Sequence, residues 1–202
     1  MKFSYPFVPS LALAAALSFT GSGASPLAAQ DELPTGEGNI PIGRMSEPTV
    51  GQATVDLKRN ESILRTLVRD GVFRFPRQEV GTVEITVRPI NRLYRPYTFT
   101  TVLGQEQCFI ANVRPVKLGS NALIRGFTSD LTEGQIIGIG DTIDLNVRVD
   151  GVAAMSVAPS VWVSGGIGRL SPDDKFTATF PGTGQIVIEL MGRKQVYNIR
   201  VR

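Results

Sequence analysis

The stretch that decides the fold is VWVSGGIGRLSPDDKFTATFPGTGQIVIEL, which runs from Val161 to Leu190. Apolar and polar residues alternate over residues 176–180 and again over residues 185–190. An alternation with a period of two is typical of strands that bury one face. Between such runs, Ser171 to Asp174 has the composition of a β-turn, with proline at the second position and aspartate at the later ones. The stretch therefore predicts short antiparallel strands joined by tight turns.

The same alternation extends through much of the chain. It recurs over residues 82–88, 142–149 and 197–201, and Gly, Pro or Asp separates successive runs. Many short, half-buried strands at this spacing predict an all-β fold, either a sandwich or a barrel. The core that we expect between two sheets contains Trp162, Ile143, Leu145, Val147, Phe176, Ala178, Ile186 and Ile188.

The C-terminal segment also resembles a known family, the bacterial Ig-like domains of the group 2 type. The matching residues are Trp162, Gly168, Leu170, Ser171, Phe176, Thr177, Ala178, Gly182 and Gly184. Asp174 departs from the pattern because the family usually has glycine there, although aspartate tolerates the left-handed conformation better than most residues. The resemblance covers residues 127–202. It implies an antiparallel immunoglobulin-like β-sandwich in a cell-surface or secreted module, and it implies no chemistry.

The N-terminus has the order of regions that a secretory signal peptide shows. Lys2 precedes nine apolar residues, 11–19, and small residues follow up to Ala29. Nine residues are too few to span a bilayer, which needs about 20. We therefore predict that residues 1–29 are a signal peptide, cleaved after Ala29 or alternatively after Ala24. Export would place the protein outside the cell, on its surface or in a periplasm. An uncleaved membrane anchor is the alternative.

Two segments lie between the signal peptide and the regular strands. Residues 30–57 carry five acidic residues and one basic residue, and we expect a flexible acidic leader. Residues 60–70 are predicted to form the one short helix, with Asn60 as its cap and Gly71 after its end. Its apolar stripe would be Ile63, Leu64, Leu67 and Val68. This helix begins a basic, β-rich region over residues 58–126. Residues 72–126 would form either a second small β domain or strands joined to the first sandwich.

The composition excludes several kinds of catalytic and metal site. Among the 202 residues there is no histidine and only one cysteine, Cys108. A Ser-His-Asp triad, a Cys-His pair and a histidine-ligated or cysteine-cluster metal site are therefore impossible within this chain. We expect no cofactor, no metal and no enzymatic activity. A hydrolase that uses only carboxylates, such as Glu84 and Glu189, is the remaining enzymatic alternative.

The positive charge concentrates in the middle of the chain. Residues 58–125 hold twelve basic and five acidic residues, a net charge of +7. Within them, the run VRPINRLYRPY interleaves arginines, which suit phosphate or carboxylate, with tyrosines, which offer stacking faces. The predicted polyanion site consists of Arg88, Arg92, Arg95, Tyr94 and Tyr97. Its expected partner is an acidic surface polymer or an anionic lipid rather than nucleic acid. The alternative is a solvated loop.

Three functions follow as hypotheses. The first is a noncatalytic secreted or cell-envelope protein that binds or organises a cell-surface component, for example in adhesion. The second is a structural subunit of an extracellular or envelope assembly, which associates with a protein partner or with itself through an edge strand. The third is the carboxylate-dependent hydrolase, acting on surface glycans.

Overall fold

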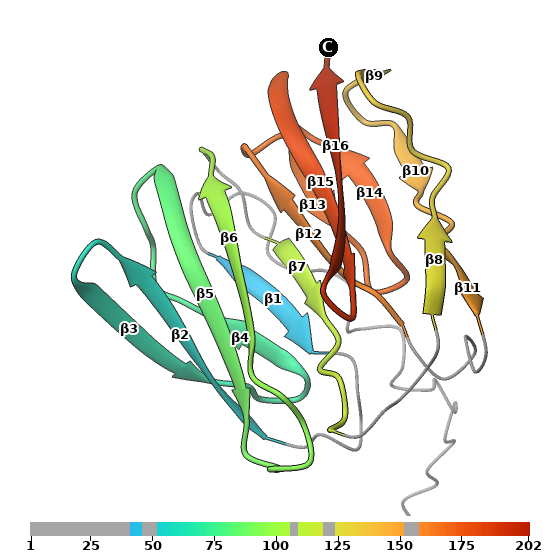
Figure 1. The fold of residues 1–202 in the computed structure, drawn as a ribbon. Helices are drawn as coiled ribbons and strands as arrows, with labels where there is room; N and C mark the ends of the chain where they lie inside the picture. The colour runs from blue at the N-terminus through green and yellow to red at the C-terminus, as the bar shows by residue number, and fades with distance from the viewer. Residues whose placement is uncertain (1–40, 46–51, 106–108, 119–123, 152–157) are drawn as a thin grey trace, which may run out of the picture. The chain divides into compact units, whose positions relative to one another are not determined.

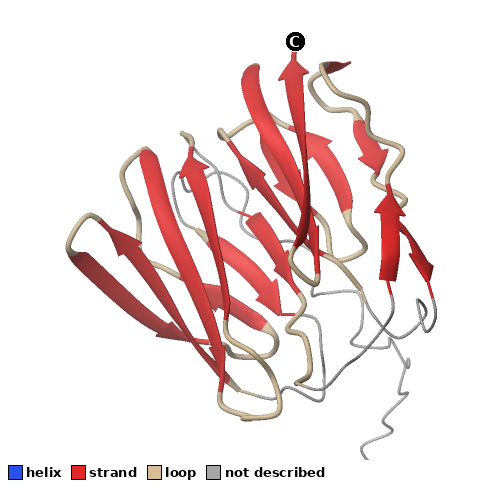
Figure 2. Ribbon diagram, viewed as in Figure 1, coloured by secondary structure: helices blue, strands red, loops and turns tan. Residues whose placement is uncertain are grey.

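The computed structural model describes residues 41–45, 52–105, 109–118, 124–151 and 158–202. In these ranges every regular element is a strand, so the predicted all-β class is confirmed (Figures 1 and 2). Among the described residues, no helix has the length and apolar character needed to cross a membrane. The predicted signal peptide, Cys108 and much of the predicted leader lie outside the described residues.

The largest sheet, here called sheet A, has seven strands. Their spatial order is β4 (Val72–Arg74), β1 (Ile42–Met45), β7 (Phe109–Val113), β12 (Ser160–Ser164), β15 (Gly182–Leu190), β16 (Arg193–Val201) and β9 (Gln135–Ile137). The pairs β1–β7 and β9–β16 are parallel, and the other pairs are antiparallel. All five residues of β12 are buried. Neither face of this central strand is exposed, because both faces of sheet A are covered.

Three smaller sheets complete the described part of the chain. Sheet B has the order β3 (Ser62–Leu67), β2 (Ala53–Arg59), β5 (Gly81–Pro89) and β6 (Tyr97–Leu103). Sheet C has the order β10 (Thr142–Asp144), β14 (Lys175–Ala178) and β13 (Gly168–Leu170). Sheet D pairs β11 (Arg148–Gly151) with β8 (Ile124–Thr128).

Sheet A separates two hydrophobic cores. In the first core, sheet B residues such as Ile85 and Phe99 pack with Trp162 of β12. In the second, Phe176 of sheet C packs with Ile186 of β15 on the opposite face of sheet A. The predicted core residues are therefore buried or partly buried, but they do not share one core. Trp162 faces sheet B, whereas the other predicted core residues belong to the second core.

Sheet A also joins the middle of the chain to its C-terminal part. β7 pairs with β12, with Asn112 opposite Val161 and Ala111 opposite Trp162. Within residues 72–126, β4 and β7 lie in sheet A together with the C-terminal strands, whereas β5 and β6 lie in a separate sheet.

The predicted helix over residues 60–70 is wrong. The segment forms a hairpin in which β2 and β3 are joined by a turn at Asn60 and Glu61 and pair through six residues of each strand. Asn60 has a φ of 51°, a left-handed conformation that asparagine accepts in tight turns. Two residues of the expected apolar stripe, Ile63 and Leu67, are 59% and 50% exposed, so no helical face is buried.

The predicted flexible leader over residues 30–57 needs correction in its described parts. Residues 42–45 form β1 inside sheet A, and Ala53 begins β2. The buried side chains of Ile42, Met45 and Val55 anchor these strands in the two cores. Their acidic and glycine-rich neighbours conceal this short apolar pattern in the sequence.

Candidate functional site

Arg88, the first residue of the predicted polyanion site, lies on the outer face of sheet B. Its guanidinium forms an ion pair with Asp56, which also accepts a 2.6 Å hydrogen bond from Nε of Arg65. The hydrogen bond from Arg65 and the charges of both arginines lower the pKa of Asp56, against the opposing effect of burial. The charge of Arg88 is therefore largely committed to a contact within the protein.

Arg92, Tyr94 and Arg95 lie in the connection between β5 and β6. The backbone N–H of Arg95 donates to the Val116 carbonyl at 3.0 Å, which fixes this loop against the segment after β7. The Tyr94 ring packs against the core beneath sheet B, while Arg92 and Arg95 are exposed. The loop is therefore anchored by its backbone and by Tyr94, and the side chains of Arg92 and Arg95 extend into solvent.

Two of the predicted residues, Arg95 and Tyr97, meet at a cavity of about 210 Å³. The polar residues that line it are Arg95, Tyr97, Arg114, Lys117, Ser160 and Glu189. Its apolar wall includes Pro96, Val116, Leu190 and Met191. The residues come from the β5–β6 loop, the start of β6, the segment after β7, β12, β15 and the turn after β15. The cavity therefore combines residues of sheets A and B.

Tyr97 and Glu189 form the half-buried floor of this cavity. The Tyr97 hydroxyl donates to Oε2 of Glu189 at 3.4 Å, and the Tyr97 ring meets Trp162 edge-on with centroids 6.3 Å apart. Burial raises the pKa of the Glu189 carboxyl, and the Tyr97 hydrogen bond and Lys194 oppose this shift. Burial, followed by the charge of Glu189, raises the pKa of Tyr97 well above its ordinary value. The floor therefore offers one hydroxyl and one carboxylate of reduced acidity.

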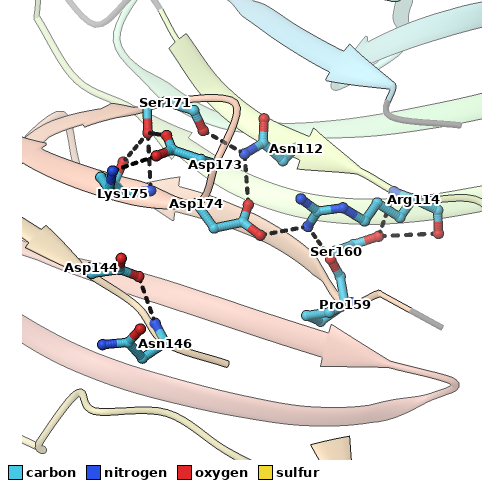
Figure 3. Close-up of polar contacts among 10 residues, drawn as sticks. All are labelled: Asn112, Arg114, Asp144, Asn146, Pro159, Ser160, Ser171, Asp173, Asp174 and Lys175. Atoms are coloured by element: carbon cyan, nitrogen blue, oxygen red, sulfur yellow. Dashed lines mark hydrogen bonds and ion pairs between the residues drawn. The ribbon is translucent and has the colours of Figure 1, made fainter. Parts of the chain in front are cut away.

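The cations of the cavity differ in how far they are already paired. Arg114 forms a 2.8 Å ion pair with Asp174 and donates to the Pro159 carbonyl at 2.5 Å (Figure 3). Arg95 and Lys117 have no such side-chain ion pair among the described residues. These two cations are therefore the ones available to an anionic ligand.

Arg114 belongs to a buried polar cluster that holds the β13–β14 turn against β7. The amide nitrogen of Asn112 donates at 2.7 Å both to the Ser171 carbonyl and to Oδ1 of Asp174 (Figure 3). The backbone N–H of Arg114 donates to the Ser160 hydroxyl at 2.9 Å. Arg114 also lines a second, larger cavity of about 520 Å³, together with Asp144 and Asn146. The cluster thus fixes a residue that both cavities share.

Sequence reasoning missed Arg114, Lys117 and Ser160 as neighbours of Arg95. Arg114 and Lys117 belong to the basic region, but they follow the tyrosine-containing run by many residues. The pairing of residues 93–95 with residues 116–118 brings Arg114 and Lys117 close to Arg95. The residue pattern within a single strand does not predict this pairing. The two carboxylates considered for a hydrolase lie on different sheets, Glu84 on β5 of sheet B and Glu189 on β15 of sheet A.

The arrangement is suited to binding. Its cations and apolar wall can hold a small anionic group, and the hydroxyls of Tyr97 and Ser160 can accept or donate hydrogen bonds to it. Across the described ranges, no three histidine, cysteine, aspartate or glutamate side chains gather closely enough to hold a metal ion.

Comparison with known proteins gives little further information. No family model matches the chain, and no curated protein sequence matches it. Among solved structures, immunoglobulin domains 1–5 of Sidekick-1 are similar at 12% identity and a TM-score of 0.28, over 74% of this chain and 32% of that one. Immunoglobulin domains 1–4 of Sidekick-1 are similar at 11% identity and a TM-score of 0.27, over 85% of this chain and 51% of that one. This chain thus spans between a third and about half of those two, and at such TM-scores the likeness carries no argument.

Proposed function

We propose that this chain is a noncatalytic protein of the cell exterior that binds an acidic surface polysaccharide through the cavity at Arg95. The observation that carries the proposal is that Arg95 and Lys117 line one cavity without an ion pair among the described residues, beside the Tyr97 and Glu189 floor. Unpaired cations at a concave, partly apolar surface bind carboxylates by charge-assisted hydrogen bonds.

The size of the cavity favours one charged unit of a polymer. Its volume of about 210 Å³ is below the roughly 300–1,000 Å³ typical of sites for drug-sized ligands and cofactors. An acidic sugar unit would place its carboxylate near Arg95 and Lys117 and its hydroxyls near Ser160 and Glu189.

The setting of this function is part of the proposal. The order of regions in residues 1–29 supports export. The packing of sheets A and C supports an Ig-like sandwich, and the sequence from Trp162 to Gly184 supports its assignment to the bacterial group 2 type over residues 127–202. Intact mass spectrometry of the protein purified after expression should show a new N-terminus at Gln30 or Ser25. A retained Met1 would contradict export by cleavage.

Binding assays with polygalacturonate test the proposed ligand class. The wild-type chain should bind this polymer and should not bind neutral dextran. Its affinity for polygalacturonate should fall as the salt concentration rises, because salt screens surface ionic contacts. Arg95→Ala and Lys117→Ala should each weaken binding by about tenfold or more, since a hydrogen bond to a charged group contributes roughly 1.5–3 kcal/mol. Anionic vesicles form a parallel arm that separates a lipid headgroup from a glycan.

Two further variants make this assay specific. Arg200→Ala removes an exposed arginine on β16 outside the cavity and should leave binding unchanged. Arg92→Ala removes the exposed arginine of the same loop that does not line the cavity. Equal losses of affinity for Arg92→Ala and Arg95→Ala would indicate that the polymer binds a diffuse basic loop and not the cavity. Binding that survives the loss of both Arg95 and Lys117 would reject the proposal.

A further inference from the structure

The edge strand β3 of sheet B is exposed to an unusual degree. Among the strands of the described ranges it pairs with β2 alone, and its apolar side chains Ile63, Leu64 and Leu67 are 59%, 38% and 50% exposed. Edge strands present a row of unpaired backbone groups, which makes long, apolar ones templates for pairing with another chain.

The opposite edge of sheet B is covered by the protein itself. The N–H of Val102 in β6 donates to the Ser164 hydroxyl at 2.9 Å, and the Val102 carbonyl accepts from Gly165 at 2.8 Å. The Thr100 carbonyl accepts from the Trp162 indole at 3.2 Å. Within the described residues, the edge strands of sheets A and C have three residues each, and the two strands of sheet D, β11 and β8, have four and five. β3, with six residues, is therefore the prominent open edge of the described structure.

β3 also lacks the features that usually protect an edge. Its sequence SILRTL has no proline, glycine or lysine, and its register with β2 runs through six pairs without a bulge. Its one charged side chain, Arg65, is drawn across the sheet to Asp56 by two hydrogen bonds of 2.6 and 3.1 Å. The charge that could repel an incoming strand is thus partly neutralised.

The hairpin geometry determines which backbone groups face outward. Arg59 and Ser62 close the two-residue turn as a pair, and such a closing pair is hydrogen-bonded. Because hydrogen-bonded and non-hydrogen-bonded pairs alternate along an antiparallel ladder, Ser62, Leu64 and Thr66 bond to β2. The N–H and C=O groups of Ile63, Arg65 and Leu67 therefore point away from sheet B, where a further strand would lie.

We propose that β3 pairs antiparallel with β3 of a second copy of this chain, with Leu64 at the two-fold axis. A two-fold axis perpendicular to the sheet leaves the side chains of one face on the same face in both copies. Ile63, Arg65 and Leu67 must therefore lie opposite Ile63, Arg65 or Leu67 of the second copy. Placing Arg65 at the axis would set two arginines directly opposite each other, which is unfavourable.

Placing Leu64 at the axis gives a complementary arrangement. Leu64 meets Leu64 of the second copy, and Arg65 lies opposite Ile63 and diagonal to Glu61 of the second copy. Glu61 is exposed and forms no ion pair among the described residues. By symmetry the Glu61–Arg65 contact forms twice, so charge complementarity identifies a second copy as the occupant. This association does not involve the cavity at Arg95.

Sedimentation velocity of the full chain over a range of concentrations tests this inference. Since a single strand pair buries a small interface, we expect a reversible dimer whose fraction rises with concentration. Ile63→Lys should weaken dimerisation by about tenfold or more, because lysine protects edges against pairing. Ile90→Lys is the matched control, since Ile90 is 57% exposed in the β5–β6 loop, and it should dimerise like the wild type.

Hydrogen exchange identifies the surface directly. The amides of Ile63, Arg65 and Leu67 should become protected as the protein concentration rises, and they should remain unprotected in Ile63→Lys. Glu61→Arg should also weaken the dimer, because it places two arginines side by side across the interface. A wild-type chain that stays monomeric at high concentration would overturn the inference. So would a dimer that leaves these amides unprotected, or protection that appears only when a different protein is added.

Discussion

Asp174 accepts a 2.7 Å hydrogen bond from the side-chain amide of Asn112, although Asp174 lies in the β13–β14 turn and Asn112 lies in β7 of sheet A, 62 positions away. Asp174 has a φ of 58°, so it occupies a left-handed position that glycine would also suit. Its other carboxylate oxygen pairs with Arg114 at 2.8 Å. The backbone of Asp174 therefore adopts the left-handed conformation that the turn requires, and its side chain connects the turn to sheet A.

Replacement of Asp174 by glycine should destabilise the protein even though glycine relieves the left-handed backbone. The change leaves Arg114 without its ion-pair partner and removes an acceptor from the fully buried Asn112. The pair is partly buried, and the loss of a hydrogen bond to a charged group costs about 1.5–3 kcal/mol. Urea unfolding followed by circular dichroism should show a loss in this range. Asp173→Ala in the same turn is the control, because its pair with Lys175 is half-exposed and contributes about 0–1 kcal/mol. Equal losses for the two variants would show that the Asp174 contacts contribute little.

Trp162→Ala should lower the free energy of unfolding by about 3–5 kcal/mol, the usual cost of truncating a buried aromatic side chain. Trp162 is 2% exposed and stacks near Phe99, with ring centroids 5.2 Å apart. Trp162→Phe should cost less, because it keeps a ring and loses the indole hydrogen bond to Thr100. Circular dichroism is the readout for both variants, since the chain has no other tryptophan to report by fluorescence. A loss below about 1 kcal/mol for Trp162→Ala would contradict its central place in the first core.

Gly104→Ala should destabilise the protein because two backbones approach closely at this position. A Cβ atom on Gly104 would lie 2.3 Å from the Cα of Gly166, and neither backbone has a flexible side chain that could yield. We expect a cost of about 1–3 kcal/mol, as for other overpacked sites. Gly126→Ala in β8 is the matched control. A Cβ there meets no atom within 4 Å, so thermal unfolding should show no loss for this variant. Similar melting temperatures for the two variants would rule out the close approach.

Acid should weaken the outer face of sheet B through Asp56. The hydrogen bond from Arg65 holds the pKa of this carboxyl below its ordinary value of 3.8. A carboxyl with a lowered folded-state pKa stabilises the fold above its unfolded-state pKa, and this contribution is lost as the pH falls through the folded-state value. Unfolding of the wild type, measured from pH 7 to pH 2, should therefore show a loss of stability below about pH 4.

Asp56→Asn should remove this part of the pH dependence. The variant should be less stable than the wild type at pH 7, and the difference should narrow as the pH falls toward 2, because protonation of the wild-type carboxyl weakens its contacts with Arg65 and Arg88. Asp130→Asn, at an exposed aspartate paired loosely with Arg148 at 3.5 Å, should leave the gap between wild type and variant small at both pH values. A constant difference between Asp56→Asn and the wild type across this range would refute the assignment.

Much of the β-structure could be predicted from the alternation of residues. The run around Val83, Ile85 and Val87 is β5, and the runs near Phe176, Ile186 and Ile199 are β14, β15 and β16. The hairpin of β2 and β3 was misread because apolar residues at positions 63, 64, 67 and 68 satisfy a helical period. Of these four residues only Val68 is buried, and it lies just after β3; the turn at Asn60 was the competing signal.

The division into two cores could not be predicted, because a central strand such as SVWVS has no polar face to indicate direction. Whether Trp162 faces sheet B or sheet C depends on pairings that form far along the chain. For the candidate site, the sequence indicated arginines and tyrosines of residues 88–97 as a group. The structure brings Arg95 and Tyr97 to one cavity and commits Arg88 to Asp56. Ion pairs between strands decide which arginines remain available to a ligand, and such pairs leave no pattern in the local sequence.

The central position of β12 in sheet A has a consequence for the order in which the chain folds. β7 needs β12 as its antiparallel neighbour, and both hydrophobic cores use side chains of β12. During synthesis, the first 150 residues therefore reach the ribosome exit before the strand that completes either core. Non-local pairing of this kind slows folding and prolongs the exposure of apolar strands. A chain stopped before Ser160 should thus be a substrate for chaperones and proteases rather than a smaller folded protein.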